Sequence, residues 1–218
     1  MSGVNPFKFL NLFGPTTTST LKKLVVIATL QSLLEGKNAV DLVQVWQREH
    51  LKWGVEEMKN FTVTYGILMF GSGQLLTPWL LKSMSGMAFT TFTNFTNLVA
   101  FILRGSVEDP MVFWAAVLPM LPGVNGGSAA AVKAMATDHA VAGGLGRGEY
   151  SAYFNNLRAC ATAIGPLVYG QTYAYCVENN IYPGTPFFVA AALGAVLPEL
   201  ILRAGLTSTE LKKHSTAA

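Results

Sequence analysis

Charged residues in this chain are separated by long uncharged intervals, and this spacing limits the folds open to it. No Asp, Glu, Lys or Arg lies between Lys59 and Lys82, or between Lys82 and Arg104. Further intervals of this kind cover 110–132, 159–177 and 179–198. A helix needs about 20 mostly apolar residues to cross the hydrocarbon of a bilayer. The intervals therefore predict a helical membrane protein.

Composition favours the same class of protein. Charged residues make up 12% of the chain, against about 25% in typical soluble domains. The net charge of +3 is dispersed, and no basic run exceeds two residues, so nucleic acid is not an expected partner. The period-2 alternation of a membrane barrel is absent, so the expected partner is a lipid bilayer crossed by helices.

The predicted fold is an all-α membrane protein with six transmembrane helices. A lead-in at 1–20 precedes the transmembrane domain at 21–206, and a tail follows at 207–218. The expected spans lie at about 24–46, 60–81, 86–103, 111–134, 153–176 and 184–203.

The distribution of basic residues predicts how the six expected spans are oriented in the membrane. The side of the termini holds nine basic residues, namely Lys8, Lys22, Lys23, Lys82, Lys133, Arg147, Arg203, Lys212 and Lys213. The other side holds four, namely Arg48, Lys52, Lys59 and Arg104. Because basic loops stay in the cytoplasm, both termini are predicted to be cytoplasmic, in a membrane that the sequence does not identify.

The first expected span is exceptional because it contains Glu35, Lys37 and Asp41. On one continuous helix, Gln31, Glu35 and Asn38 would fall within about 60° of one another, with Asp41 roughly 60° further round. Intramembrane carboxyl groups often exchange protons and line substrate paths. One interpretation is a cavity-lining stripe with Glu35 or Asp41 as the proton or cation site. The alternative is that this stretch ends in a water-exposed loop.

Milder polar residues fall inside other expected spans. Gln74, Asn125, Asn155 and Gln171 are candidates for the same substrate or proton pathway, although such groups often only bond neighbouring helices. No catalytic pair, metal cluster or cofactor motif occurs, and the three histidines lie in expected loops or tails. An enzyme is therefore not expected, and neither a metal nor a cofactor is predicted.

Two stretches resemble motifs of the major facilitator superfamily of transporters. The run from Gly146 to Gly170 resembles the family's eleventh helix, with Gly148-Glu149 at its entry and Gly165-Pro166 near its end. The run GQLLTPWLLKSMSG resembles the loop between helices eight and nine, and it places Gly73, Pro78, Lys82 and Gly86 in register. The most similar branch is the tetracycline-resistance-like drug:proton antiporters.

This resemblance implies the C-terminal six-helix half of such a transporter, formed by two inverted three-helix repeats. It implies alternating-access transport of a small organic solute, with or without proton coupling, and a cavity lined by the first, second, fourth and fifth spans. The loop between helices eight and nine departs from the pattern because it has one basic residue and no acid. The expected partner is an N-terminal half or a second copy. The alternative is a truncated or regulatory membrane protein that does not transport.

Overall fold

A computed structural model describes residues 6–34 and 37–205, without the side chains of Pro6, 37–39 and 124–126. Every regular element in these residues is helical, so the all-α prediction is confirmed. The elements are η1 (Pro6–Phe13), α1 (Ser19–Ser32), α2 (Lys37–Glu49), α3 (Val55–Gly71), η2 (Ser72–Leu76), α4 (Thr77–Ser83), α5 (Gly86–Ser106), α6 (Pro110–Ala115), η3 (Leu118–Gly126), α7 (Gly127–Ala142), α8 (Arg147–Glu178), α9 (Thr185–Ala191), η4 (Ala192–Val196) and α10 (Leu197–Gly205).

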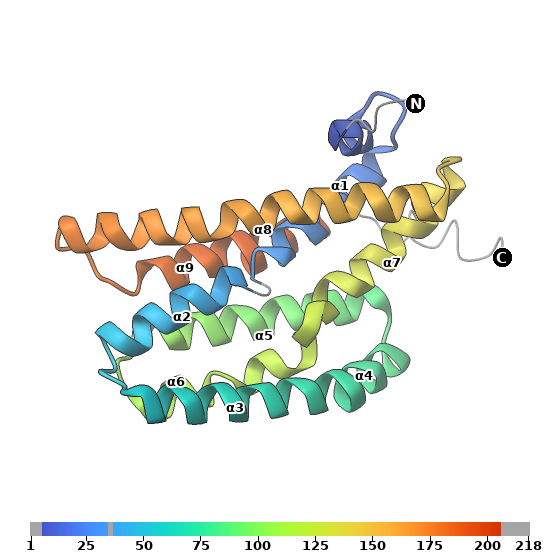
Figure 1. The fold of residues 1–218 in the computed structure, drawn as a ribbon. Coiled ribbons are helices and arrows are strands. Elements are labelled where there is room, and N and C mark those ends of the chain that lie inside the picture. The colour runs from blue at the N-terminus through green and yellow to red at the C-terminus, as the bar shows by residue number, and fades with distance from the viewer. Residues whose placement is uncertain (1–5, 35–36, 206–218) are drawn as a thin grey trace.

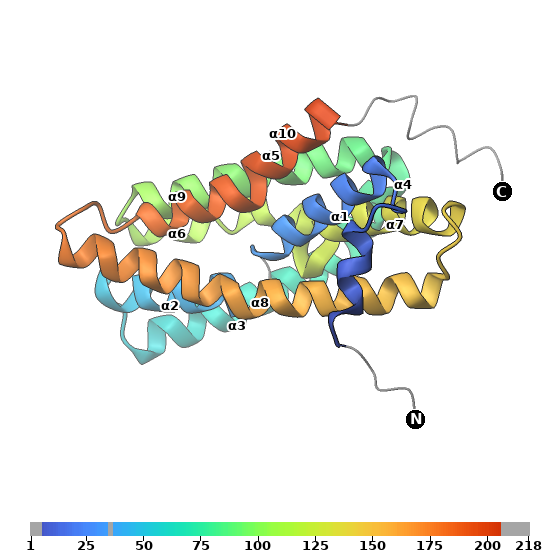
Figure 2. The same ribbon diagram turned by 90° about the horizontal axis from the view of Figure 1, so that it is seen from above.

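The helices form one elongated bundle in which the chain runs back and forth along the long axis. The long α8 lies along one side of the bundle, and α3 with α4 lies along the opposite side (Figure 1). The first described element, η1, and the end of the last one, α10, lie toward the same end of the bundle (Figure 2). Short turns join the long elements, so neighbours in sequence pack antiparallel.

Local sequence explains where several helices begin. The Ser85 hydroxyl accepts a hydrogen bond from the Ala88 N–H (3.2 Å) at the start of α5. Asp109 accepts from the Met111 and Val112 N–H groups (2.7 and 3.2 Å), and Pro110 follows it as the first residue of α6. These side chains satisfy N–H groups that the first helical turn leaves without a backbone partner.

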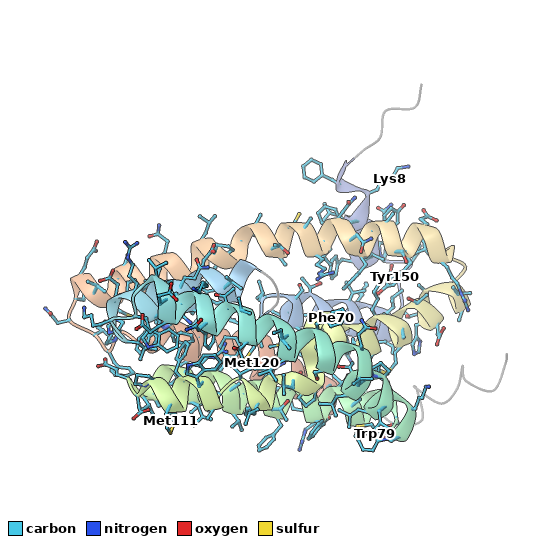
Figure 3. The ribbon with its side chains drawn as sticks, turned by 60° about the horizontal axis from the view of Figure 1, so that its bottom comes forward. Lys8, Phe70, Trp79, Met111, Met120 and Tyr150 are labelled. Atoms are coloured by element: carbon cyan, nitrogen blue, oxygen red, sulfur yellow. The ribbon has the colours of Figure 1, made fainter. Side chains whose placement is uncertain are left out.

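The helix α1 lies at the centre of one half of the bundle. Leu24, Val25, Ile27 and Ala28 are fully buried there, against α7, α8 and α10. A second cluster fills the other end of the bundle around Trp46, and its members include Phe101, Phe113 and Phe187. Large apolar side chains also cover the outside, as Trp79 and Met111 show in Figure 3.

Three helices are long and apolar enough to cross a membrane, namely Gly86–Ser106, Pro110–Ala142 and Thr185–Ala204. The segments 19–49, 55–83 and 147–178 are not among them. The polar side chains of α8 lower its mean hydropathy, although it is 32 residues long. The expected first span is divided, because α1 ends at Ser32 and α2 begins at Lys37. The continuous helix predicted at 24–46 is therefore wrong.

Three other segments that run the length of the bundle also change their helical geometry near the middle. A π-helical turn, η2, separates α3 from α4, and a second, η4, separates α9 from α10. The 3-10 segment η3, which contains Pro122, separates α6 from α7. Proline removes a backbone donor and clashes with the preceding turn, so an α-helix cannot continue unchanged through this region. Departures of this kind often mark functional sites.

The start of α9 packs very closely against the end of α5. A Cβ added at Gly184 would overlap the carbonyl oxygen of Gly105. A Cβ at Gly105 would in turn lie 2.9 Å from Phe187 and from Phe188. This contact requires residues without side chains in both elements.

We predict that Gly184→Ala destabilises the protein by about 1–3 kcal/mol, because the new methyl group must displace backbone. The matched control is Gly66→Ala in α3, where an added Cβ meets nothing within 4 Å. The control should be neutral or stabilising by up to about 1 kcal/mol, since Ala favours the helix. Thermal unfolding of the detergent-solubilised protein, followed by circular dichroism, measures both. Equal melting temperatures would contradict the packing argument.

Candidate functional site

A chain of hydrogen bonds between side chains connects three helices inside the bundle. The Gln31 Nε2 group of α1 donates to Asn94 Oδ1 of α5 (2.7 Å). Asn94 Nδ2 donates to Glu199 Oε2 of α10 (3.0 Å), and Arg203 Nε donates to Glu199 Oε1 (2.7 Å). We call these four residues the interhelical network.

The network has a closed inner end and an accessible outer end. Gln31 and Asn94 are buried, and Gln31 Oε1 has no hydrogen-bond partner among the described residues. Arg203 is exposed and borders an open groove of about 610 Å³ along the first half of α5. The network therefore leads from an unused acceptor in the interior to a charged group at the surface.

The α5 helix carries further buried polar groups on the same face. Thr90, Thr93, Asn94 and Asn97 are all buried, and their spacing puts them on one stripe of a 3.6-residue helix. Asn97 Nδ2 donates to Ser128 Oγ of α7 across a long 3.4 Å contact. The stripe therefore faces α1, α7 and α10 and makes the centre of the bundle polar.

Polar side chains also connect two of the irregular segments. The Ser72 hydroxyl in η2 donates to the Leu121 carbonyl in η3 (2.6 Å). The Thr77 hydroxyl donates to the Pro122 carbonyl (3.0 Å). These hydroxyls satisfy carbonyl groups in a segment that has lost regular α-helical bonding. The two departures from α-helix are thus held against each other inside the bundle.

A buried arginine lies near the far end of α5. Arg104 is 2% exposed, and its guanidinium carbon lies 5.3 Å from the ring centre of Phe113 and 6.0 Å from that of Tyr65. Its Nε and Nη2 atoms have no hydrogen-bond partner among the described residues. Cation–π contacts therefore compensate for part of its loss of hydration. Arg104 joins α5 to α3 and α6.

The predicted pathway residues do not all meet in this region. Gln31 lies in the interhelical network, whereas the side chains of Asp41, Gln74, Asn155 and Gln171 are exposed on α2, η2 and α8. Glu35 lies outside the described residues, as do the side chains of Asn38 and Asn125. The proposed single-helix stripe from Gln31 to Asp41 does not apply, because α1 and α2 are separate helices.

The motif residues fall at ends and interruptions of helices. Gly73 lies in η2, and Pro78 lies in the first turn of α4. Lys82 is exposed near the end of α4, and Gly86 is the first residue of α5. Gly148 and Glu149 lie in the first turn of α8, where Tyr153 donates a hydrogen bond to Glu149 (2.6 Å). The α8 helix continues through Gly165 and Pro166, and Gly165 is buried.

Sequence reasoning missed Asn94, Asn97, Ser72 and Glu199. The signal for the first two was the recurrence of Thr and Asn at 90, 93, 94 and 97 in an otherwise apolar segment, which predicts one polar stripe. Glu199 was taken as the boundary of a charge-free interval. No group of three or more metal-binding side chains occurs among the described residues.

We predict that Asn94→Leu lowers the free energy of unfolding by about 1–3 kcal/mol, because it leaves Gln31 and Glu199 without their buried amide partner. A double-mutant cycle with Gln31→Leu should be non-additive, since the two side chains share one hydrogen bond. Asn155→Leu, at an exposed position of α8, is the control and should change stability by less than about 0.5 kcal/mol. Additive losses in the cycle would show that the bond contributes nothing.

Comparisons with protein-family models, curated proteins and solved structures were made for the whole chain. None of them returns a match. The resemblance to the major facilitator superfamily therefore depends on the motifs in this sequence, and the site on the geometry described above.

Proposed function

We propose that this chain is a multi-pass membrane protein that moves a small organic solute by alternating access, as the C-terminal half of a major-facilitator-type transporter. The observation that carries the proposal is the meeting of irregular helical segments with buried polar side chains inside an otherwise apolar bundle. Transporters commonly bind solutes where discontinuous helices meet near the middle of the membrane.

The depth of the polar centre supports this reading. The α5 helix is 21 residues, or about 31 Å, long, which matches the hydrocarbon thickness of a bilayer. Asn94 and Asn97 are 8 and 11 residues from its first residue, Gly86, and so lie about 12 and 16 Å along the helix. Polar groups held at this depth are costly to bury in lipid and often serve transport.

The irregular segments meet in pairs, which favours a moving bundle over a rigid one. One hydrogen bond connects η2 to η3, and a second connects η3 to Thr77, the first residue of α4. The end of α1 contacts η4, where a Cβ at Gly194 would overlap the Leu34 side chain. A π-helical turn has one weak point in its hydrogen bonding, where the helix can bend. In our proposal, these pairs are the places where the passes bend as access alternates.

Uptake of ethidium into proteoliposomes, driven by an imposed pH gradient, tests the proposal. The chain is reconstituted alone and together with the N-terminal half of a drug:proton antiporter. Wild type should accumulate the dye in at least one of the two preparations. The variants Glu35→Gln, Asp41→Asn and Glu199→Gln are compared. We expect dye uptake to fall most in the variant that lacks the carboxyl group that carries the proton. Glu57→Gln, at an exposed position in the first turn of α3, is the control.

The result also separates the two candidate functions. Gradient-dependent uptake that is lost in one carboxyl variant and kept in Glu57→Gln supports proton-coupled transport. Uptake without sensitivity to the gradient supports transport without proton coupling. No uptake of ethidium or of radiolabelled tetracycline in either preparation would overturn the transport proposal and favour the non-transporting membrane protein.

A further inference from the structure

The N-terminal segment η1 has three distinct faces because it is a 3-10 helix. Such a helix has three residues per turn, so side chains three apart lie in one row. Phe9 and Leu12 form a buried row, 9% and 2% exposed, that packs in the core cluster around α1. Phe7, Leu10 and Phe13 form a second row, which is 64%, 56% and 38% exposed. The burial of one apolar row therefore leaves another facing outward.

The orientation of η1 differs from that of the rest of the bundle. It runs crosswise over the outer side of α8 near the end of the bundle where both termini lie (Figures 1 and 2). Contacts with α8 hold it there, because Phe9 and Leu12 share a buried cluster with Tyr150 and Tyr153. If the bundle axis is the membrane normal, η1 lies in the plane of the membrane.

The depth of η1 follows from the length of α8. At 1.5 Å per residue, its 32 residues span about 48 Å, which exceeds a hydrocarbon core of about 30 Å by roughly 9 Å at each end. Tyr153, which packs in the same cluster as Phe9 and Leu12 of η1, is six residues from the first residue, Arg147, and so about 9 Å along the helix. This places η1 at the boundary between headgroups and acyl chains.

Charge at this end of the bundle indicates which surface η1 would meet. Lys8 is exposed on the third face of η1 and reaches away from the bundle (Figure 3). Basic residues at the ends of the neighbouring elements are Lys22, Lys82, Arg147 and Arg203, and they outnumber the exposed acids Asp138 and Glu149 there. The opposite end has an excess of acids, namely Glu49, Glu56, Glu57, Glu108, Asp109 and Glu178, over the exposed bases Arg48, Lys52 and Lys59. The η1 end is therefore complementary to anionic lipid headgroups.

We propose that η1 is an in-plane membrane anchor, with Phe7, Leu10 and Phe13 inserted among the acyl chains of a leaflet rich in anionic lipid and Lys8 among its headgroups. Segments with one apolar face and a basic polar face bind bilayers in this way. The proposal rests on the membrane-embedded part of the proposed function, but it does not depend on transport. It assigns η1 to the lipid surface rather than to a second copy of the chain.

Depth-dependent fluorescence quenching of the full chain in vesicles tests this assignment. Exposed Cys160 and buried Cys176 are first replaced by Ser and Ala. Leu10→Cys then carries an environment-sensitive fluorophore, and Phe13→Cys repeats the measurement on the same row. Lys8→Cys is the matched control on another face of η1. Phe95→Cys, at a 62% exposed position in the middle of α5, reports on membrane insertion.

The vesicles contain phosphatidylcholine with phosphatidylglycerol, with spin labels either near the headgroup or deep in the acyl chain. We expect labels at 10 and 13 to be quenched by the shallow spin label and protected from aqueous iodide, whereas the label at 8, among the headgroups, should remain accessible to iodide. Replacing phosphatidylglycerol with phosphatidylcholine should weaken the shallow quenching. The label at 95 should be quenched by the deep spin label.

Other quenching patterns would contradict the anchor, the insertion of the bundle in the membrane, or both. If iodide quenches positions 10 and 8 equally, η1 faces water and the anchor is wrong. If neither quencher reaches 10 and 13, protein covers the row and the anchor is again wrong. If the anchor fails in either way but the deep spin label quenches the fluorophore at position 95, the bundle is still inserted in the membrane and only the anchor is wrong. If lipid quenches 10 but not 95, the anchor stands and the multi-pass proposal fails.

Discussion

Satisfying polar groups inside an apolar helical bundle is the constraint on which the rest of this structure depends. Passes of the chain lose regular α-helical bonding at η2, η3 and η4, and each loss must be compensated in the interior. Ser72 and Thr77 donate to the Leu121 and Pro122 carbonyls for this reason. The irregular segments η2 and η3 consequently contact each other through hydrogen bonds, and the centre of the bundle becomes polar.

The same constraint explains the interhelical network. An amide such as Asn94 can accept and donate at once, so it bonds Gln31 on one side and Glu199 on the other. Arg203 compensates the Glu199 carboxylate near the surface. The Gln31 Oε1 atom remains without a partner among the described residues, and it is an acceptor that a solute with an N–H or O–H group would match in the proposed transport cycle. Stability and the proposed function thus use the same side chains.

The two ends of the bundle are chemically different, which bears on how it would lie in a membrane. One end combines basic residues with the crosswise η1, and the other combines acids with aromatic side chains around Arg104. The difference follows the basic-residue count that predicts cytoplasmic termini. Under the proposed anchor, η1 would hold the basic end at the cytoplasmic leaflet.

The sequence by itself predicted an all-helical chain, because apolar intervals of span length exceed what a soluble helix needs. It also indicated Gln31 as an interior polar residue, since helical periodicity is a local property. Which groups Gln31 meets depended on tertiary structure, because Asn94 is 63 residues away and Glu199 a further 105. Packing likewise decided the division of the predicted span 24–46 into α1 and α2. It also decided the exposure of Asp41, Gln74, Asn155 and Gln171. Periodicity assigns a residue to a face of its own helix, but only the neighbouring helices determine whether that face is covered.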